Sequence, residues 1–268
     1  VGLSALATNV TGAGNTAIGK DSLKVSLGDN NTAVGLNAMI ANTTGANNTG
    51  IGYLALGANT TGDNNTAVGF EASFSNLTTS NNAAFGFQAL KYNTGGAHST
   101  AVGAYALWRN VNGSRNTGVG FQALQDNISG YYNAALGYEA GKNNSGGYNI
   151  FIGSKAGPST TASESNKLYI HNNKSGPPGS ATGPLIGGDF SKKEVYINGS
   201  LSISGEFTVL GGGTESGKIK LNCETNTHGI SPLKEHMACL YWLEFAPCVV
   251  RMASNFLAGV LGLAGFFL

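Results

Sequence analysis

The residue types that could bind a metal gather near the end of the 268-residue chain: Cys223, His228, His236, Cys239 and Cys248. Thiolates and imidazoles are preferred ligands of Zn²⁺, but structural zinc sites typically use Cys pairs two to four residues apart, and these spacings contain none. An odd number of cysteines confined to the last fifth of the chain is also no disulfide framework. We therefore expect no metal and no cofactor here, and buried or unpaired thiols instead.

The other candidates for chemistry are carboxylates and two isolated histidines. Gly-Asp-Asn-Asn occurs at 28–31 and again at 62–65, but a calcium site needs six or more oxygen ligands, and carboxylates do not recur at a shared position. No acid pair of the kind that cleaves glycosidic bonds stands out. His98 and His171 stand alone and are expected to be ordinary turn or surface residues. The sequence therefore predicts a protein that is not an enzyme.

The side chains best suited to contact another molecule are those that depart from the repeated pattern described below: Tyr92, Trp108, Arg109, Tyr131 and Tyr132. Aromatic rings supply large, partly polar contact surfaces for sugars and proteins. We expect receptor contact at these residues, with a glycan or a protein as the ligand. Packing of the same side chains between chains remains an alternative.

The composition is that of an ordered, weakly charged and turn-rich chain. Charged residues make up only 11%, the net charge is +1, and 41 residues are glycine. A hydrophobic fraction of 41% argues against disorder, which favours high charge and few apolar residues. A net charge near zero gives no basic surface for nucleic acid, so we expect no nucleic-acid partner.

A glycine that closes each Thr-Ala-Val-Gly-like stretch recurs every 16 or 17 residues, and we call it the marker glycine. The marker glycines are Gly2, Gly19, Gly35, Gly52, Gly69, Gly86, Gly103, Gly120, Gly137 and Gly153. An asparagine recurs seven residues after the marker, at Asn9, Asn42, Asn59, Asn76, Asn93, Asn110, Asn127 and Asn144. The consensus unit is N-T-A-V-G-x-x-A-L-x-x-N-x-T-G-x-x. A motif repeated this often is typical of a structural repeat and not of a catalytic site, which is normally needed once.

Each unit predicts two short strands, T-A-V-G and x-A-L-x, joined by turns in which Asn and Gly supply positive φ. Two glycines in so short a unit leave no room for a helix. Such units bury their apolar faces by stacking in parallel, about 4.8 Å apart. The prediction is an all-β protein: a parallel β-solenoid or β-roll of 16–17-residue coils over residues 1–157. The asparagine column is expected to form an axial hydrogen-bonded ladder or to adopt left-handed turns.

Alternation along each strand predicts two unlike faces. Ala17 and Gly19 point one way, whereas Thr16 and Ile18 point the other. A thin interior suits the small residues, which leaves a stripe of larger apolar side chains outside. Because a long exposed apolar stripe indicates an interface, we expect association about the long axis, most plausibly three-fold. The opposite arrangement, with large residues inside, stays open at this point.

The N-T-A-V-G…A…G unit resembles the head repeats of trimeric autotransporter adhesins, and more closely their longer-period relatives in phage and phage-like tail fibres. Residues 166–200, NKLYIHNNKSGPPGSATGPLIGGDFSKKEVYINGS, and 217–229, GKIKLNCETNTHG, are also similar to tail-fibre segments. The resemblance covers about 1–229 and implies a left-handed, homotrimeric β-roll. The unit here is longer than the usual adhesin repeat.

Three segments are expected: the solenoid at 1–157, a β-rich connector at 158–210, and an atypical C-terminal segment at 211–268. The apolar stretch 252–268 is interpreted as a trimer cap, a membrane anchor or a translated wrong reading frame. The resemblance implies a rigid trimeric shaft of a virion tail fibre that contacts a host receptor. The alternative is a bacterial trimeric adhesin at the cell surface, anchored by its C-terminus.

Overall fold

The computed structural model describes residues 2–158, 160–172, 184–198 and 201. Packing divides the chain at Leu201, and the second unit, Ser202–Leu268, lies outside the described residues together with the three cysteines and the apolar stretch 252–268. Within the described ranges the chain contains strands and turns and no helix. The all-β prediction is therefore confirmed for this part of the protein.

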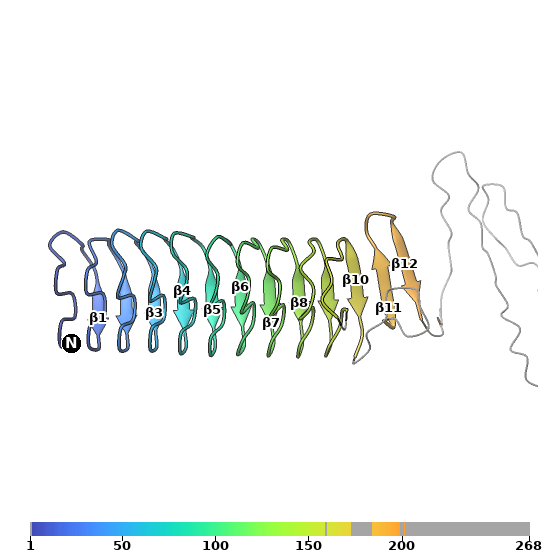
Figure 1. The fold of residues 1–268 in the computed structure, drawn as a ribbon, viewed down its shortest axis with the longest axis horizontal. Coiled ribbons are helices and arrows are strands. Elements are labelled where there is room, and N and C mark those ends of the chain that lie inside the picture. The colour runs from blue at the N-terminus through green and yellow to red at the C-terminus, as the bar shows by residue number, and fades with distance from the viewer. Residues whose placement is uncertain (1, 159, 173–183, 199–200, 202–268) are drawn as a thin grey trace, which may run out of the picture. The chain divides into compact units, whose positions relative to one another are not determined.

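One three-residue strand occurs in each coil and ends directly before a marker glycine. These strands are β1 (Thr16–Ile18), β2 (Thr32–Val34), β3 (Thr49–Ile51), β4 (Thr66–Val68), β5 (Ala83–Phe85), β6 (Thr100–Val102), β7 (Thr117–Val119), β8 (Ala134–Leu136) and β9 (Ile150–Ile152). Each pairs in parallel with the next, and equivalent residues face one another. Figure 1 shows the strands side by side in chain order. The parallel solenoid predicted from the marker glycines is thus confirmed.

The parallel stack ends in an antiparallel hairpin (Figure 1). Strand β10 (Lys167–Ile170) pairs in parallel with β9. Strand β11 (Ile186–Asp189) then runs antiparallel to β10, and β12 (Glu194–Ile197) runs antiparallel to β11. The described residues of the connector at 158–210 therefore extend the same sheet.

The second strand predicted from x-A-L-x is wrong, because these residues form a turn. The second and fourth residues after each marker glycine have positive φ, as in Asp21 (55°) and Leu23 (47°). Left-handed residues at alternate positions bend the chain and cannot lie in a pleated strand. Leu23 is nevertheless fully buried. The short apolar run in this segment indicated burial, and not an extended backbone.

The core takes three side chains from a typical coil. They are the central strand residue, the alanine three residues after the marker, and the leucine or methionine that follows it; Ala33, Ala38 and Met39 are 0% exposed. The outer strand residues Ile18 and Leu136 are 50% and 56% exposed. The small strand residues therefore face the interior and the large ones face outward, as expected. The leucines assigned to a second strand complete the core.

The two glycine columns are needed for different reasons. The marker glycine Gly69 has a φ of +139°, and a Cβ there would lie 2.3 Å from the carbonyl oxygen of Gly86. Gly45, ten residues after its marker, lacks positive φ, but a Cβ there would lie 2.4 Å from Asn42 Oδ1. The expected positive φ is therefore wrong for this second column, which is glycine for lack of space.

The core changes its side chains near β9. Phe151 and Tyr169 follow Ala135 in the inward strand position, are 0% and 1% exposed, and stack with ring centroids 5.6 Å apart. The preceding coil compensates by placing Gly141 where most coils have leucine. A Cβ on Gly141 would lie 2.5 Å from Phe151 Cδ2. Large and small residues have thus exchanged positions, as a close-packed core requires.

Candidate interaction surface

The asparagines seven residues after the marker form the predicted axial ladder. Asn59 Nδ2 donates to Asn42 Oδ1 at 2.9 Å, and Asn127 Nδ2 donates to Asn110 Oδ1 at 2.8 Å. The same amide of Asn59 also donates to the carbonyl oxygen of Gly62 at 3.0 Å. The asparagines from Asn42 to Asn144 are fully buried, so the ladder satisfies polar groups that water cannot reach, whereas the side chain of Asn9 in the first coil is partly buried and bonds to Gly12.

The ladder has clear ends and no left-handed residues. At its start Ser26 Oγ accepts from Asn42 Nδ2 at 3.1 Å, and at its end Asn144 Nδ2 donates instead to the carbonyl oxygen of Glu164 at 3.0 Å. None of the ladder asparagines has positive φ, so the expected left-handed role is wrong for them. Positive φ occurs at other asparagines, such as Asn47 and Asn64, five residues before the marker.

A second buried asparagine column was not assigned a role from the sequence, although it opens the consensus unit. Asn48 is typical: its backbone N–H donates to Asn31 Oδ1 at 2.9 Å, and its Nδ2 donates to the carbonyl oxygen of Gly62 at 2.8 Å. Ser99 fills the one gap, with its Oγ accepting from the backbone of Asn116 at 3.3 Å. Two polar columns inside the core therefore link every coil to its neighbours.

An exposed ring ladder, also missed from the sequence, starts one residue after the marker. Ring centroids of Tyr53 and Phe70 are 5.0 Å apart, and those of Phe70 and Phe87 are 5.2 Å apart. Where the next coil has Ala104, the ring of Tyr105 continues the series, 5.2 Å from Phe87. The ladder then proceeds through Phe121 and Tyr138, whose centroids lie 5.5 Å apart.

The outer strand residues form a second apolar column, directly before the marker glycines. Ile51, Phe85 and Leu136 are 39%, 41% and 56% exposed. Between residues 34 and 152 neither this column nor the one after the marker contains a charged residue. We call the two columns together the apolar seam: Val34, Ile51, Val68, Phe85, Val102, Val119, Leu136 and Ile152 form its outer-strand column, and Leu36, Tyr53, Phe70, Phe87, Tyr105, Phe121 and Tyr138 form its ring column.

Two of the predicted receptor residues adjoin this seam. The rings of Tyr92 and Trp108 meet edge to face at 5.1 Å, and Trp108 contacts the ring of Tyr105 at 6.2 Å. Lys91 lies over the Tyr92 ring, 5.1 Å from its centroid, and forms a 2.8 Å ion pair with Glu71. Burial lowers the pKa of Lys91, but the hydrogen bond and charge of Glu71 outweigh it and raise that pKa above its ordinary value.

The other predicted receptor residues lie in different surroundings. Arg109 is half exposed and pairs with Asp126 at 3.2 Å. Tyr131 and Tyr132 form a separate cluster with Tyr148, in which Tyr132 and Tyr148 stack 5.2 Å apart with an interplanar angle of 5°. The guanidinium of Arg115 lies 5.2 Å from the Tyr132 ring centroid. The predicted set is therefore divided into a seam group of Tyr92 and Trp108, the separate Arg109–Asp126 pair, and a tyrosine cluster. Tyr148 is a member of this cluster that the sequence did not indicate.

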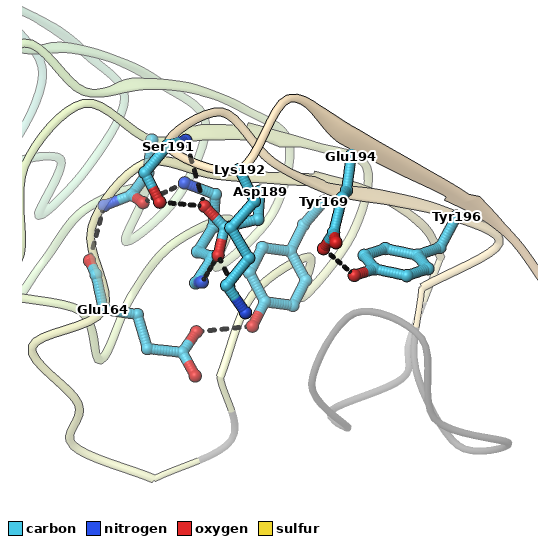
Figure 2. A network of polar contacts seen from close by, with 9 residues as sticks. Glu164, Tyr169, Asp189, Ser191, Lys192, Glu194 and Tyr196 are labelled. Carbon is cyan, nitrogen blue, oxygen red and sulfur yellow. Dashed lines mark hydrogen bonds and ion pairs between the residues drawn. The ribbon is translucent and has the colours of Figure 1, made fainter. Parts of the chain in front are cut away.

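A polar network holds the terminal hairpin in place (Figure 2). The Asp189 carboxylate accepts from Lys167 Nζ at 2.6 Å and from the backbone N–H of Ser191 at 3.0 Å. The hydrogen bonds from Lys167 and then Ser191 hold the pKa of Asp189 well below its usual range. Tyr169 donates to Glu164, and burial followed by this bond raises the pKa of Tyr169 above its usual range. This arrangement fixes the turn between β11 and β12.

The two isolated histidines have structural partners. His98 Nε2 lies 3.4 Å from Asn81 Nδ2, and His171 Nδ1 accepts from the backbone N–H of Leu185 at 3.2 Å. Among the described residues, His, Cys, Asp and Glu form no group of three able to hold a metal ion.

Comparison with models of protein families, with curated proteins and with solved structures finds no match for the chain. In the part of the chain that the structure describes, no helix has the length and hydropathy of a membrane span.

Proposed function

We propose that the protein is a structural fibre protein, in which three copies form a rigid shaft of a viral or phage-like tail fibre. The observation that carries this proposal is the unbroken parallel register from β1 to β10, with buried polar columns inside the stack and an uncharged apolar seam outside it. The shaft provides reach, and a host-surface glycan or protein is its partner.

The coil-to-coil contacts support a stiff shaft. Coil β3 is bonded to coil β4 through strand pairing, through the Asn59–Asn76 amide contact at 3.1 Å, and through the Asn48–Asn65 contact at 2.8 Å. In a repeat protein each unit contacts only its neighbours, so resistance to bending depends on how many bonds join them. Three separate hydrogen-bonded lines around each coil oppose both sliding and hinging.

The tyrosine cluster is the feature that favours the second candidate function, a bacterial trimeric surface adhesin anchored by its C-terminus. Tyr131, Tyr132 and Tyr148 are 47%, 45% and 47% exposed. Exposed, clustered aromatic side chains suit contact with a matrix protein or glycan. In either function this cluster is the proposed receptor contact.

Light scattering and negative-stain imaging of the purified full chain test the proposal. We expect a mass of three chains and rods whose repeat segment, with ten parallel strands, is roughly 45 Å long at the usual strand spacing. A folded single chain would overturn it. Immunogold labelling of virions and of bacterial cells then separates the fibre from the adhesin.

A further inference from the structure

The apolar seam is large enough to be an interface. Eleven of its side chains are 37–56% exposed: Leu36, Tyr53, Phe70, Phe87, Phe121 and Tyr138 in the ring column, and Ile51, Phe85, Val102, Leu136 and Ile152 in the outer-strand column. With 150–250 Å² for each aromatic side chain, this exposure leaves on the order of 800 Å² of apolar surface per copy. This total equals the area that one partner buries in a standard stable interface, and in a ring of three copies it is shared between the two contacts that each chain makes.

The geometry of the ring ladder disfavours a sugar as the occupant. Phe70 and Phe87 are nearly parallel, with an interplanar angle of 10° and centroids 5.2 Å apart, and Phe121 and Tyr138 are likewise parallel at 10°. These stacked rings overlap partly, so they cover one another's faces and present their edges outward, whereas Tyr105 meets Phe87 and Phe121 edge to face at 72° and 88°. Sugars stack on ring faces. The tyrosine cluster differs, because Tyr131 meets Tyr132 and Tyr148 edge to face, at 73° and 78°, and is not covered in this way. The seam is instead suited to apolar side chains that repeat at the same spacing as the coils.

A second copy of this chain has that spacing. We propose that the outer-strand column of one copy packs against the ring column of the next copy at the same coil level, in parallel, around a three-fold axis. This inference rests on the proposed function and assigns its chain-to-chain contact.

Two features support the three-fold, parallel arrangement. A cyclic trimer uses heterologous contacts, in which two different surfaces of each chain meet, and the seam consists of two different columns on either side of the marker glycines. Polar groups also border it: Lys20 and Ser154 occupy the ring-column position at its two ends, and the Glu71–Lys91 and Glu139–Lys142 ion pairs, at 2.8 and 2.9 Å, lie beside it. An apolar centre with a polar rim is typical of protein interfaces.

Site-directed cross-linking tests the inference in the full chain with its three native cysteines replaced by serine. Differently tagged Ile51→Cys and Tyr53→Cys chains are co-expressed and treated with a short bis-maleimide. We expect this pair to cross-link about tenfold more than Ile51→Cys with the exposed off-seam control Ser129→Cys, because the interface raises the effective concentration of the two thiols. An antiparallel contact would instead cross-link Ile51→Cys with Tyr138→Cys.

Charge insertion provides a second measurement if a cysteine variant fails to fold. Phe87→Lys is expected to yield mostly single chains with an unchanged circular dichroism spectrum, whereas Ser129→Lys stays trimeric. A trimer that retains its mass in Phe87→Lys, or that cross-links only through Tyr138, would overturn the seam assignment and leave the fibre function intact. A wild-type protein that is a folded monomer would overturn both.

Discussion

The buried asparagine ladder makes a quantitative prediction at Asn59. Its side chain takes part in three hydrogen bonds: it donates to Asn42 Oδ1 at 2.9 Å and to the carbonyl oxygen of Gly62 at 3.0 Å, and it accepts from Asn76 Nδ2 at 3.1 Å. In Asn59→Ala, Gly62 and Asn76 keep other partners, at 2.8 Å from Asn48 Nδ2 and 2.9 Å to the carbonyl oxygen of Thr79. Asn42 Oδ1 loses its donor inside the core.

The expected loss follows from these contacts. Each net hydrogen bond contributes about 1 kcal/mol, and one buried acceptor left without a donor costs about 1–3 kcal/mol. The bonds to Gly62 and Asn76 together contribute about 2 kcal/mol, and the orphaned Asn42 acceptor adds about 1–3 kcal/mol. Asn59→Ala should therefore lower the free energy of unfolding by about 3–5 kcal/mol. Asn112 is exposed and its side chain makes no hydrogen bond in the described structure, so Asn112→Ala should change it by less than about 0.5 kcal/mol.

Native-state hydrogen exchange is the suitable assay, because long repeat arrays need not unfold in one step. We expect amides of the two coils beside position 59 to lose protection in Asn59→Ala, while those near β8 and β9 lose less. The reasoning is refuted if Asn59→Ala and Asn112→Ala lose protection equally. In that case the ladder would be a result of coil stacking and not a source of its stability.

Three further predictions concern the turns, the core and the terminal hairpin. Gly69→Ala should cost about 3 kcal/mol or more, because it combines a glycine-only φ with a 2.3 Å backbone contact; Gly118→Ala, at a position where other coils have alanine, should change stability by less than about 1 kcal/mol in thermal melts. Phe151→Ala should lower the free energy of unfolding by about 3–5 kcal/mol, and the double variant Phe151→Ala/Gly141→Leu should recover part of that loss in a denaturant titration. Equal losses in the single and the double variant would contradict the exchange of large and small side chains. The low pKa of Asp189 means that the folded state keeps this carboxylate charged, so its contribution to stability is present above the ordinary pKa of 3.8 and is lost as the pH falls below that value. Wild-type stability should therefore fall more steeply than that of Asp189→Asn below about pH 4, and parallel pH profiles would refute this.

The part of the fold that could be predicted from the sequence is the part that requires the same residue type at the same position of every coil. The marker glycine recurs because both its φ and the neighbouring backbone exclude any side chain, as at Gly69. Its position therefore reveals the period, the parallel register and the inward direction of residues such as Ala67. The second strand was predicted wrongly because a pair of adjacent apolar residues, such as Ala38 and Met39, is fully buried in this left-handed turn as well. A short apolar run alone does not distinguish this turn from a strand.

The ring ladder was not predicted because its positions share large apolar side chains and not one residue type. Leu36, Tyr53, Phe70 and Phe87 differ in identity but share size and apolar character. The next coil even moves the ring by one residue, from position 104 to Tyr105, and the centroid spacing to Phe87 stays at 5.2 Å. A pattern search that follows one residue type at one offset cannot find such a column, whereas the structure shows it as a continuous contact.

The shift at Tyr105 also bears on what the column is for. If the rings only filled the surface of a single chain, Ala104 would leave a gap of little consequence, because exposed surface tolerates small residues. The ring is instead replaced from the adjacent position, and it contacts both Phe87 at 5.2 Å and Phe121 at 6.0 Å. Inside the coil the asparagine columns set the axial register, and the one gap in them is filled by Ser99 in a similar way. Compensation at both columns indicates that continuity along the axis matters inside and outside the stack. Since a ladder exposed to water gains little from continuity, the outer column has its greatest effect when another repeating chain lies against it.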